Sequence, residues 1–271
     1  MSSFAPTVKV CEGLSEISSV ARDIILATIH ARKDTSVPVV VALSGGSTPR
    51  KLYEDLHEKD LAVLKQHAAL FILGDERLVP EDDEQSNYFM AAKALLRDVP
   101  SSDIITVDPT EALETSKNEA RGADGAWAVA QKYEMKLRSR LPCHGLEGKS
   151  QLMPVVDIVL LGFGSDGHTA SIFPESPAAA DTEHVVSVSF PSPTMNPKVW
   201  RVTLSKAAIQ HAKHVIVLAC GEDKNWVVRG VLDEAPTTPV PVARFLRECH
   251  GSVTMLLDRD SGKGVSALGN R

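Results

Sequence analysis

Short apolar runs alternate along the chain with stretches in which apolar residues recur at helical spacing. The runs predict buried strands at 38–43, 68–73, 156–161, 214–220 and 252–258. Further strands are expected at 104–107, 184–190 and 199–204, and a loop at 142–150. The periodic stretches predict helices at 14–33, 86–97, 121–140 and 221–232, with another after residue 48. Strands that alternate with helices predict one α/β domain, residues 1–271, which is Rossmann-like: a mostly parallel sheet with helices on both faces.

Four of the predicted strands run directly into glycine-rich polar segments. These segments are SGGST (44–48), GDER (74–77), GFGSDGH (162–168) and CGEDK (220–224). Ligands of open α/β sheets bind beyond the carboxyl ends of the strands. We therefore expect the four segments to gather along one edge of the sheet and to form a binding site there.

The first segment has the residues of a phosphate-binding turn. Its glycines let the backbone approach a ligand closely, while Thr48 is a plausible N-cap and Pro49 suits the first helical position. A helix that starts there presents free N–H groups to an anion. The alternative is a plain strand–turn–helix connection. The GK[ST] ending of a Walker A loop is absent, so ATP is not implied.

Basic residues near the other strand ends are candidate anion ligands. Arg77 is suited to a phosphate or a carboxyl group, and Asp75 to orienting Arg77 or accepting a proton. Arg201 interrupts an apolar strand, so it requires an anionic partner if it is buried. Lys224 follows the strand at 214–220. The alternative interpretation is that each is a surface charge, and that 74–77 is a solvated loop.

The segment 162–168 contains a GxGxxG pattern, which makes a dinucleotide site a formal alternative. Pro174, however, ends any helix soon after the pattern, whereas the dinucleotide fingerprint opens a long helix. We therefore favour a loop that places Asp166 and His168 at the sheet edge. A histidine can take a proton from water near neutral pH, and a carboxylate can fix its tautomer. The alternative for His168 is a capping or packing role.

Composition narrows the classes of function. The 271 residues have a formal net charge of -6, which disfavours nucleic acid and anionic membranes as partners. The four cysteines are scattered, and neither a secretory signal nor a membrane-spanning run is present, so we expect a cytoplasmic protein with free thiols. His211 and His214 have a spacing compatible with metal ligation but lack acidic or thiol companions, so no metal is predicted.

Taken in order, these segments resemble the 6-phosphogluconolactonases, within the superfamily that includes glucosamine-6-phosphate deaminase. The resemblance covers roughly residues 38–232. It rests on LSGGSTP (43–49), GDERLVP (74–80), SNYFM (86–90), GFGSDGHTASIFP (162–174), WRVTLS (200–205) and GEDKNWVVRGVL (221–232). It implies a Rossmann-like fold without a nucleotide, no cofactor, a sugar phosphate lactone as the small-molecule partner, and a monomer or weak oligomer.

Two departures separate the chain from the deaminases that it also resembles. The deaminases carry a glutamate that assists ring opening, and its place here is occupied by Phe173. Their Asp-Glu-Tyr motif corresponds to Asp75-Glu76-Arg77. Because loss of an acid–base carboxylate removes proton transfers worth about 10²–10⁴-fold in rate, the lactonase is favoured.

The resemblance implies hydrolysis of 6-phospho-D-glucono-1,5-lactone to 6-phospho-D-gluconate, the second step of the oxidative pentose phosphate pathway. In the mechanism that we expect, His168 accepts a proton from water as it attacks C1, Asp166 holds the imidazole, and backbone N–H groups of a glycine-rich loop stabilise the oxyanion. His168 then returns the proton to the ring oxygen. The residues expected to bind the substrate and its phosphate are Ser44, Gly45, Gly46, Ser47, Thr48, Asp75, Arg77, Asn87, Gly167, Arg201 and Lys224.

Overall fold

The central element of the fold is a parallel sheet. The computed structural model describes residues 5–34, 36–115, 122–145, 152–192, 195–233 and 240–265. Seven strands form the sheet in the order β1-β12-β11-β8-β2-β3-β5, and every pair is parallel. Their bounds are β1 (Thr7–Val10), β2 (Val40–Leu43), β3 (Leu70–Leu73), β5 (Ile104–Ile105), β8 (Ile158–Leu161), β11 (His214–Ala219) and β12 (Ser252–Leu257).

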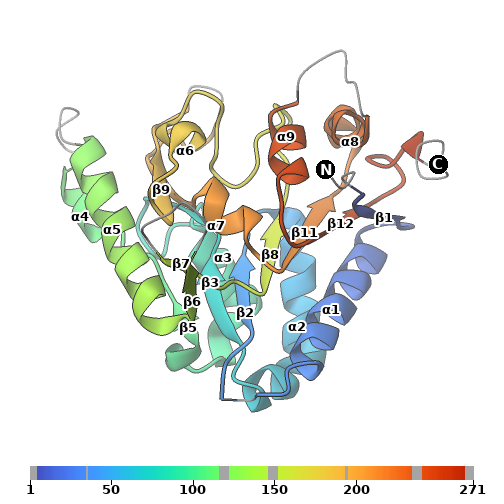
Figure 1. Ribbon diagram of the computed structural model, residues 1–271, viewed down its shortest axis with the longest axis horizontal. Helices are drawn as coiled ribbons and strands as arrows, with labels where there is room; N and C mark the ends of the chain where they lie inside the picture. The colour runs from blue at the N-terminus through green and yellow to red at the C-terminus, as the bar shows by residue number, and fades with distance from the viewer. Residues whose placement is uncertain are drawn as a thin grey trace.

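Helices pack around this sheet (Figure 1). The α-helices are α1 (Leu14–His30), α2 (Ser47–Gln66), α3 (Asn87–Ala94), α4 (Thr110–Thr115), α5 (Gly122–Arg140), α6 (Pro177–Ala180), α7 (Lys206–Gln210), α8 (Asn225–Leu232) and α9 (Pro241–Arg247). The 3₁₀-helices are η1 (Leu96–Asp98), η2 (Ser101–Asp103) and η4 (Glu222–Lys224). The predicted α/β class with a mostly parallel sheet is confirmed. Among the described helices, none combines the length and the hydrophobicity that crossing a bilayer requires.

The core strands are buried along their whole length. Every residue of β2, β3 and β8 is buried, which is why these strands read as continuous apolar runs in the sequence. Their register also aligns their carboxyl ends: Leu43 lies opposite Leu73, and Val217 lies opposite Leu161. The polar segments that follow β2, β3, β8 and β11 therefore emerge along one edge of the sheet, as the sequence predicts. In Figure 1, this edge faces the top of the view.

Two smaller antiparallel sheets complete the fold. One has the order β4 (Asp75–Arg77), β10 (Arg201–Leu204), β9 (Val186–Ser189), and the other pairs β6 (Cys143–Gly145) with β7 (Leu152–Pro154). In the first of these sheets, Arg77 lies opposite Arg201 and Asp75 opposite Thr203. Because side chains alternate along a strand, Asp75 and Arg77 share one face of β4 and Glu76 points to the other.

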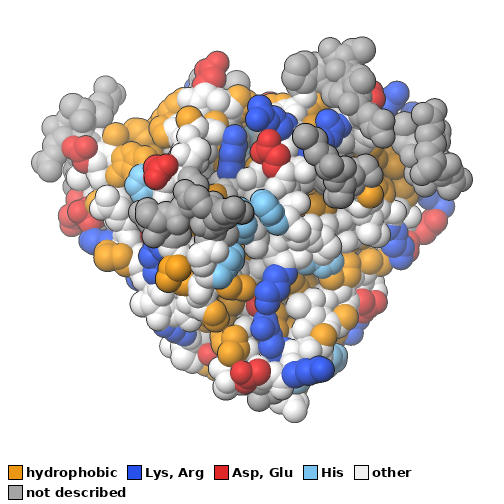
Figure 2. Space-filling model, viewed as in Figure 1, with side chains coloured by type: hydrophobic (Ala, Val, Ile, Leu, Met, Phe, Trp, Pro, Cys, Tyr) orange, Lys and Arg blue, Asp and Glu red, His pale blue; other side chains and the backbone are white. Residues whose placement is uncertain are grey.

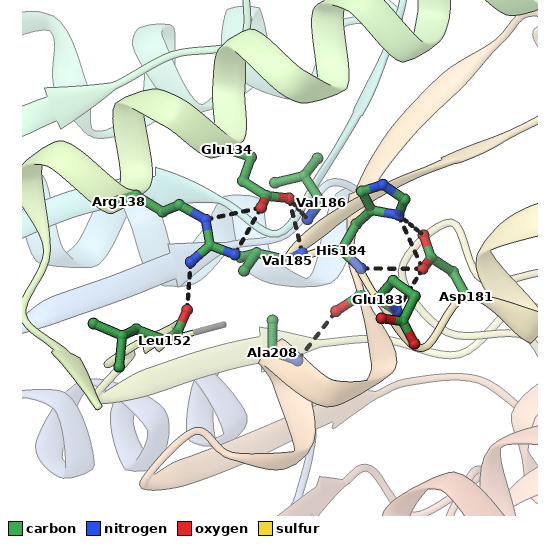
Figure 3. A network of polar contacts seen from close by, with 10 residues as sticks. Glu134, Arg138, Leu152, Asp181, Glu183, His184, Val185, Val186 and Ala208 are labelled. Carbon is green, nitrogen blue, oxygen red and sulfur yellow. Dashed lines mark hydrogen bonds and ion pairs between the residues drawn. The ribbon is translucent and has the colours of Figure 1, made fainter. Parts of the chain in front are cut away.

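Helix α5 anchors the sheet of β4, β10 and β9 through one carboxylate (Figure 3). Glu134 accepts hydrogen bonds from the N–H groups of Val185 (2.8 Å) and Val186 (3.0 Å), and its other oxygen pairs with Arg138. The guanidinium of Arg138 in turn donates to the carbonyl of Leu152 in β7. The start of β9 is thereby tied to α5, which fixes the position of the small sheet against the body of the molecule.

The structure corrects two local predictions and rules out one alternative. Helix α2 begins at Ser47 with Gly46 as its N-cap, so Thr48 lies inside the first turn and is not the cap. The GDER segment is not a solvated loop: it forms β4, because β10 supplies a pairing partner from far along the sequence. Part of the predicted loop at 142–150 is strand β6, and residues 146–150 lie outside the described residues.

Candidate active site

The SGGST turn is held by a buried tyrosine. The N–H of Ser44 donates to the Tyr53 hydroxyl, and this hydroxyl donates to the carbonyl of Ser44, both at 2.8 Å. Among the described residues, the N–H groups of Gly46 and Ser47 have no hydrogen-bond acceptor. The turn thus presents the start of a 20-residue helix, with its free N–H groups and positive dipole end, at the sheet edge.

Asn87 joins the SGGST turn to β4. Its side-chain amide donates to the carbonyl of Asp75 at 2.9 Å and to the carboxylate of the same residue at 3.3 Å. A Cβ at Gly45 would lie 1.9 Å from the Asn87 side-chain oxygen, so only glycine allows this approach. Gly45, Asp75 and Asn87, which the sequence assigns to the site, therefore lie together.

A third contact brings the loop after β8 to the same place. The hydroxyl of Ser171 donates to Asp75 at 2.6 Å, and the carbonyl of Ser171 accepts a hydrogen bond from Ser189 in β9. Asp75 is buried and has both carboxylate oxygens engaged, by Asn87 and by Ser171. This arrangement suits a residue that orients its neighbours.

Two arginines face each other across β4 and β10. The Arg201 residue is only 3% exposed, and its Nε, like that of Arg77, is buried without a hydrogen-bond partner among the described residues. Burial, followed by the charge of Arg77, lowers the pKa of Arg201. Arg77 also donates to the carbonyl of Gln85 at 2.6 Å. Two adjacent guanidinium groups with unused donors have the chemistry to bind a dianion such as phosphate, and we call this pair of side chains the arginine cradle.

Asp166 and His168 form a bonded pair. Nδ1 of His168 donates to the carboxylate of Asp166, and the backbone N–H of His168 donates to the same oxygen at 3.2 Å. The side-chain hydrogen bond from His168 is the main cause that lowers the pKa of Asp166, so this carboxylate is ionised at neutral pH. Because an ionised carboxylate only accepts hydrogen bonds, the proton of a neutral imidazole lies on Nδ1, and Nε2 keeps its lone pair.

The loop around this pair is tightly folded. A Cβ at Gly164 would lie 2.1 Å from the His168 ring, so the ring occupies space that only glycine leaves open. The N–H of Gly164 donates to the carbonyl of His168, and the N–H of Gly167 donates to the carbonyl of Gly164. These two N–H groups are therefore engaged inside the loop and are not free to bind an oxyanion.

Phe173 connects the histidine to the arginine pair. Its ring lies against the His168 imidazole with centroids 4.5 Å apart, and the Arg201 guanidinium carbon lies 5.5 Å from the Phe173 centroid. One aromatic ring thus separates the imidazole from the buried cation. In Figure 2, basic side chains gather at the upper edge of the molecule, between the positions that α6 and α9 have in Figure 1, with an acidic side chain among them.

The segment after β11 approaches the site from the other side. The indole N–H of Trp226 donates to the carbonyl of Ser165 at 3.0 Å, and the same ring lies close to Gly167. Lys224 forms an ion pair with Asp223 at 2.7 Å. Among the described residues, it has no contact with Arg77 or Arg201, the other two basic candidates for binding the phosphate. Burial is the main cause that raises the pKa of the Cys220 thiol at the end of β11.

Most of the chain matches a known protein family. Residues 14–255 match the family described as glucosamine-6-phosphate isomerases/6-phosphogluconolactonase. The chain belongs to this family.

Several proteins of this family that are similar to the chain are 6-phosphogluconolactonases. A crystal structure of 6-phosphogluconolactonase from Leishmania guyanensis is 72% identical with a TM-score of 0.93, covering 97% of this chain and 99% of that one. The 6-phosphogluconolactonase from Trypanosoma cruzi is 48% identical with a TM-score of 0.91, covering 97% and 98%. The Homo sapiens 6-phosphogluconolactonase is 32% identical, covering 82% of this chain and 79% of the human protein. The predicted resemblance, and with it the prediction of a lactone hydrolase, is confirmed.

Sequence reasoning missed several residues that hold the candidate site together. These residues are Tyr53, Ser171 and Trp226. Ser171 and Trp226 have partners far away in sequence, Asp75 and Ser165, whereas the partner of Tyr53, Ser44, is nine residues away. Phe173 was noted only for the glutamate that it replaces, whereas it packs between His168 and Arg201. A signal for Ser171 and for Trp226 was available, because they lie within the segments 162–174 and 221–232 that carry the resemblance.

The loop after β8 that carries His168 also borders a cavity of about 240 Å³. Its walls include His168, Ile172 and Pro174 from the loop, Lys206 from α7 and Phe245 from α9. Ile172 and Pro174 line this cavity, whereas Phe173 between them contacts Arg201.

The two histidines considered for metal ligation have other contacts. His211 stacks on His250 with centroids 4.1 Å apart, and His214 is hydrogen-bonded to Thr254. Over the described part of the chain, no three His, Cys, Asp or Glu side chains are grouped to hold a metal ion.

Proposed function

We propose that this chain hydrolyses 6-phospho-D-glucono-1,5-lactone to 6-phospho-D-gluconate, with His168 as the general base that activates water. The observation that carries the proposal is one linked arrangement. An imidazole whose Nδ1 is engaged by Asp166 lies one aromatic ring away from the buried Arg201, which lies opposite Arg77, and the Nε of each arginine has no hydrogen-bond partner among the described residues. The imidazole is suited to proton transfer, and the arginines are suited to a phosphate dianion.

In this proposal, the phosphate binds between the arginines and the start of α2. The free N–H groups of Gly46 and Ser47 supply neutral hydrogen-bond donors, and the positive dipole end of α2 favours the negative charge of the phosphate. Arg201 and Arg77 supply charge, and Lys224 approaches from the segment after β11 once it releases Asp223. Binding energy from the phosphate, remote from C1, then orients the lactone carbonyl beside His168.

The chemical step uses the unprotonated Nε2 of His168. This nitrogen accepts a proton from water as the water oxygen attacks C1, and a tetrahedral oxyanion forms. Asp166 stabilises the imidazolium that results, because it is already ionised and bonded to Nδ1. The imidazolium then donates the proton to the ring oxygen as the C1–O bond breaks, so the proton balance closes without a covalent intermediate.

A variant of the histidine tests the proposal. His168→Ala should lower kcat on freshly prepared lactone by about 10²–10⁴-fold, the usual worth of a general base. Binding of 6-phosphogluconate should stay within about threefold, because the arginine cradle is untouched. Turnover is followed by a dehydrogenase-coupled assay, with the uncatalysed opening of the lactone subtracted.

His184→Ala is the matched control. Like His168, His184 bonds through Nδ1 to a nearby aspartate, Asp181, but it lies beside Trp127 rather than Phe173. Turnover in this control should be close to that of the wild type. Near-normal turnover in His168→Ala would refute the general-base role.

A further inference from the structure

A buried carboxylate that the proposed mechanism does not use lies in β4, next to Arg77. Glu76 is 3% exposed and is flanked in β4 by Asp75 and Arg77, from which its side chain points away. A buried carboxylate is costly unless its oxygens are hydrogen-bonded. Its partners therefore indicate what the residue does.

Both oxygens of Glu76 accept two hydrogen bonds each. One oxygen accepts hydrogen bonds from the backbone N–H groups of Arg77 (2.7 Å) and Asn87 (2.8 Å). The other oxygen accepts hydrogen bonds from the backbone N–H of Tyr88 (2.7 Å) and the hydroxyl of Ser86 (3.0 Å). The carboxylate thus caps the first turn of α3 from a distant strand, where the helix dipole also favours negative charge.

The turn that Glu76 caps carries the groups that shape the binding site. Asn87 reaches from this turn to Asp75 and to Gly45 of the SGGST turn. Arg77 is tied to the same segment at two points, by its N–H through Glu76 and by its guanidinium through the carbonyl of Gln85. Residues 85–88 can therefore move relative to β4 only if the contacts of Glu76 break.

We propose that Glu76 is a positioning residue for phosphate recognition, which locks the 85–88 turn onto β4 and so aims Arg77 and Asn87 at the phosphate. The proposal rests on the proposed function for the identity of the ligand. Glu76 touches neither the His168–Asp166 pair nor the reacting carbon, so its effect falls on binding of the phosphorylated end.

A carboxylate suits this position better than an amide of the same shape. Glutamine offers one acceptor oxygen, and its NH₂ group would face N–H donors of the α3 turn. Its neutral side chain would also remove the negative charge that offsets the adjacent cations Arg77 and Arg201; the charge of Glu76 acts to raise the pKa of Arg201.

The test compares two buried carboxylates, Glu76→Gln and Asp157→Asn. Asp157 is also buried; it accepts the N–H of Val40 and pairs with Lys213 and Arg32 at the amino end of β8, away from the site. Both variants should lose stability. Only Glu76→Gln should raise KM for the phosphorylated lactone, by about tenfold, with kcat within about twofold, because one charged hydrogen bond to the phosphate is misplaced.

Titration calorimetry with 6-phosphogluconate gives a second readout. The dissociation constant of Glu76→Gln should rise by a similar factor, and that of Asp157→Asn should stay within about twofold. Both measurements are made at about pH 8, since burial raises the pKa of Glu76 to about 7 and the carboxylate must be ionised.

Each outcome decides the inference separately from the proposed function. The positioning role is overturned if KM and the dissociation constant are unchanged in Glu76→Gln, or if they rise equally in Asp157→Asn. In either case, turnover by the wild type upholds the activity. Absence of wild-type turnover overturns the activity, and the calorimetric comparison still decides the role of Glu76. If Glu76→Gln does not fold, Glu76→Asp keeps the charge with a shorter reach, and wild-type constants in that variant overturn the inference.

Discussion

Arg201 gives the sharpest prediction, because the same substitution should move stability and affinity in opposite directions. Arg201→Met keeps the apolar stem that packs toward Phe173 and removes the charge. In the described structure, the guanidinium has one weak hydrogen bond, to the carbonyl of Pro197 at 3.4 Å, and a like charge from Arg77 nearby. The carboxylates of Asp75 and Glu76 offset part of this charge, but burial and the charge of Arg77 outweigh them and lower the pKa of Arg201. Within the part of the chain that the structure describes, the buried charge is therefore incompletely compensated when no ligand is bound.

The two magnitudes follow from this arrangement. Replacing a buried, poorly compensated charge with an apolar side chain of similar size should raise the free energy of unfolding by about 1–2 kcal/mol. A charged hydrogen bond is worth about 1.5–3 kcal/mol, so losing it should raise KM for the phosphorylated lactone by about 10- to 150-fold. KM for unphosphorylated gluconolactone should change little, because that substrate does not engage the cradle.

Urea unfolding in a buffer free of phosphate and sulfate measures the stability, and the coupled assay measures KM. Added inorganic phosphate should stabilise the wild type more than Arg201→Met, as ligand linkage requires. Arg22→Met is the control: Arg22 pairs with the buried Asp60, so this variant should lose stability with KM unchanged. If Arg201→Met unfolds as easily as Arg22→Met, the charge is compensated in the folded protein and the reasoning fails. If KM rises equally for both lactones, the phosphate assignment is wrong.

Two further predictions concern the cation after β11 and the response to acid. Lys224→Ala should weaken the binding of phosphorylated ligands by about tenfold and leave kcat on unphosphorylated lactone nearly unchanged. If the variant loses affinity equally for the two lactones, Lys224 does not belong to the phosphate site. Burial alone would raise the pKa of Asp55, but hydrogen bonds from Lys59, Ser18 and Lys51 outweigh it and hold the pKa well below its ordinary value. Because this pKa is depressed by folding, Asp55 stabilises the protein above about pH 4 and the contribution is lost as pH falls further. Urea unfolding of Asp55→Asn should thus show a large loss of stability near neutral pH and a smaller one at about pH 3, and a pH-independent difference would contradict this.

The sequence by itself determined the elements that depend on local pattern. Apolar runs marked the strands of the parallel sheet, since burial on both faces leaves no polar positions in β2, β3 and β8. Because parallel strands point the same way, the residues after each strand had to share one edge, and this placed the SGGST turn and the His168 loop together. Asp166 and His168 are two residues apart, so their pairing was also accessible to local reasoning.

Tertiary structure alone decided how these segments meet. The pairing of Arg77 with Arg201 joins strands more than 120 residues apart, and no local pattern encodes that register. The same pairing makes Asp75–Arg77 a strand and not the solvated loop of the alternative interpretation, and it directs the side chain of Glu76 away from the site, to the start of α3. The reason is physical: a side chain's charge is written in the sequence, but its burial and its partners depend on which distant backbone lies beside it.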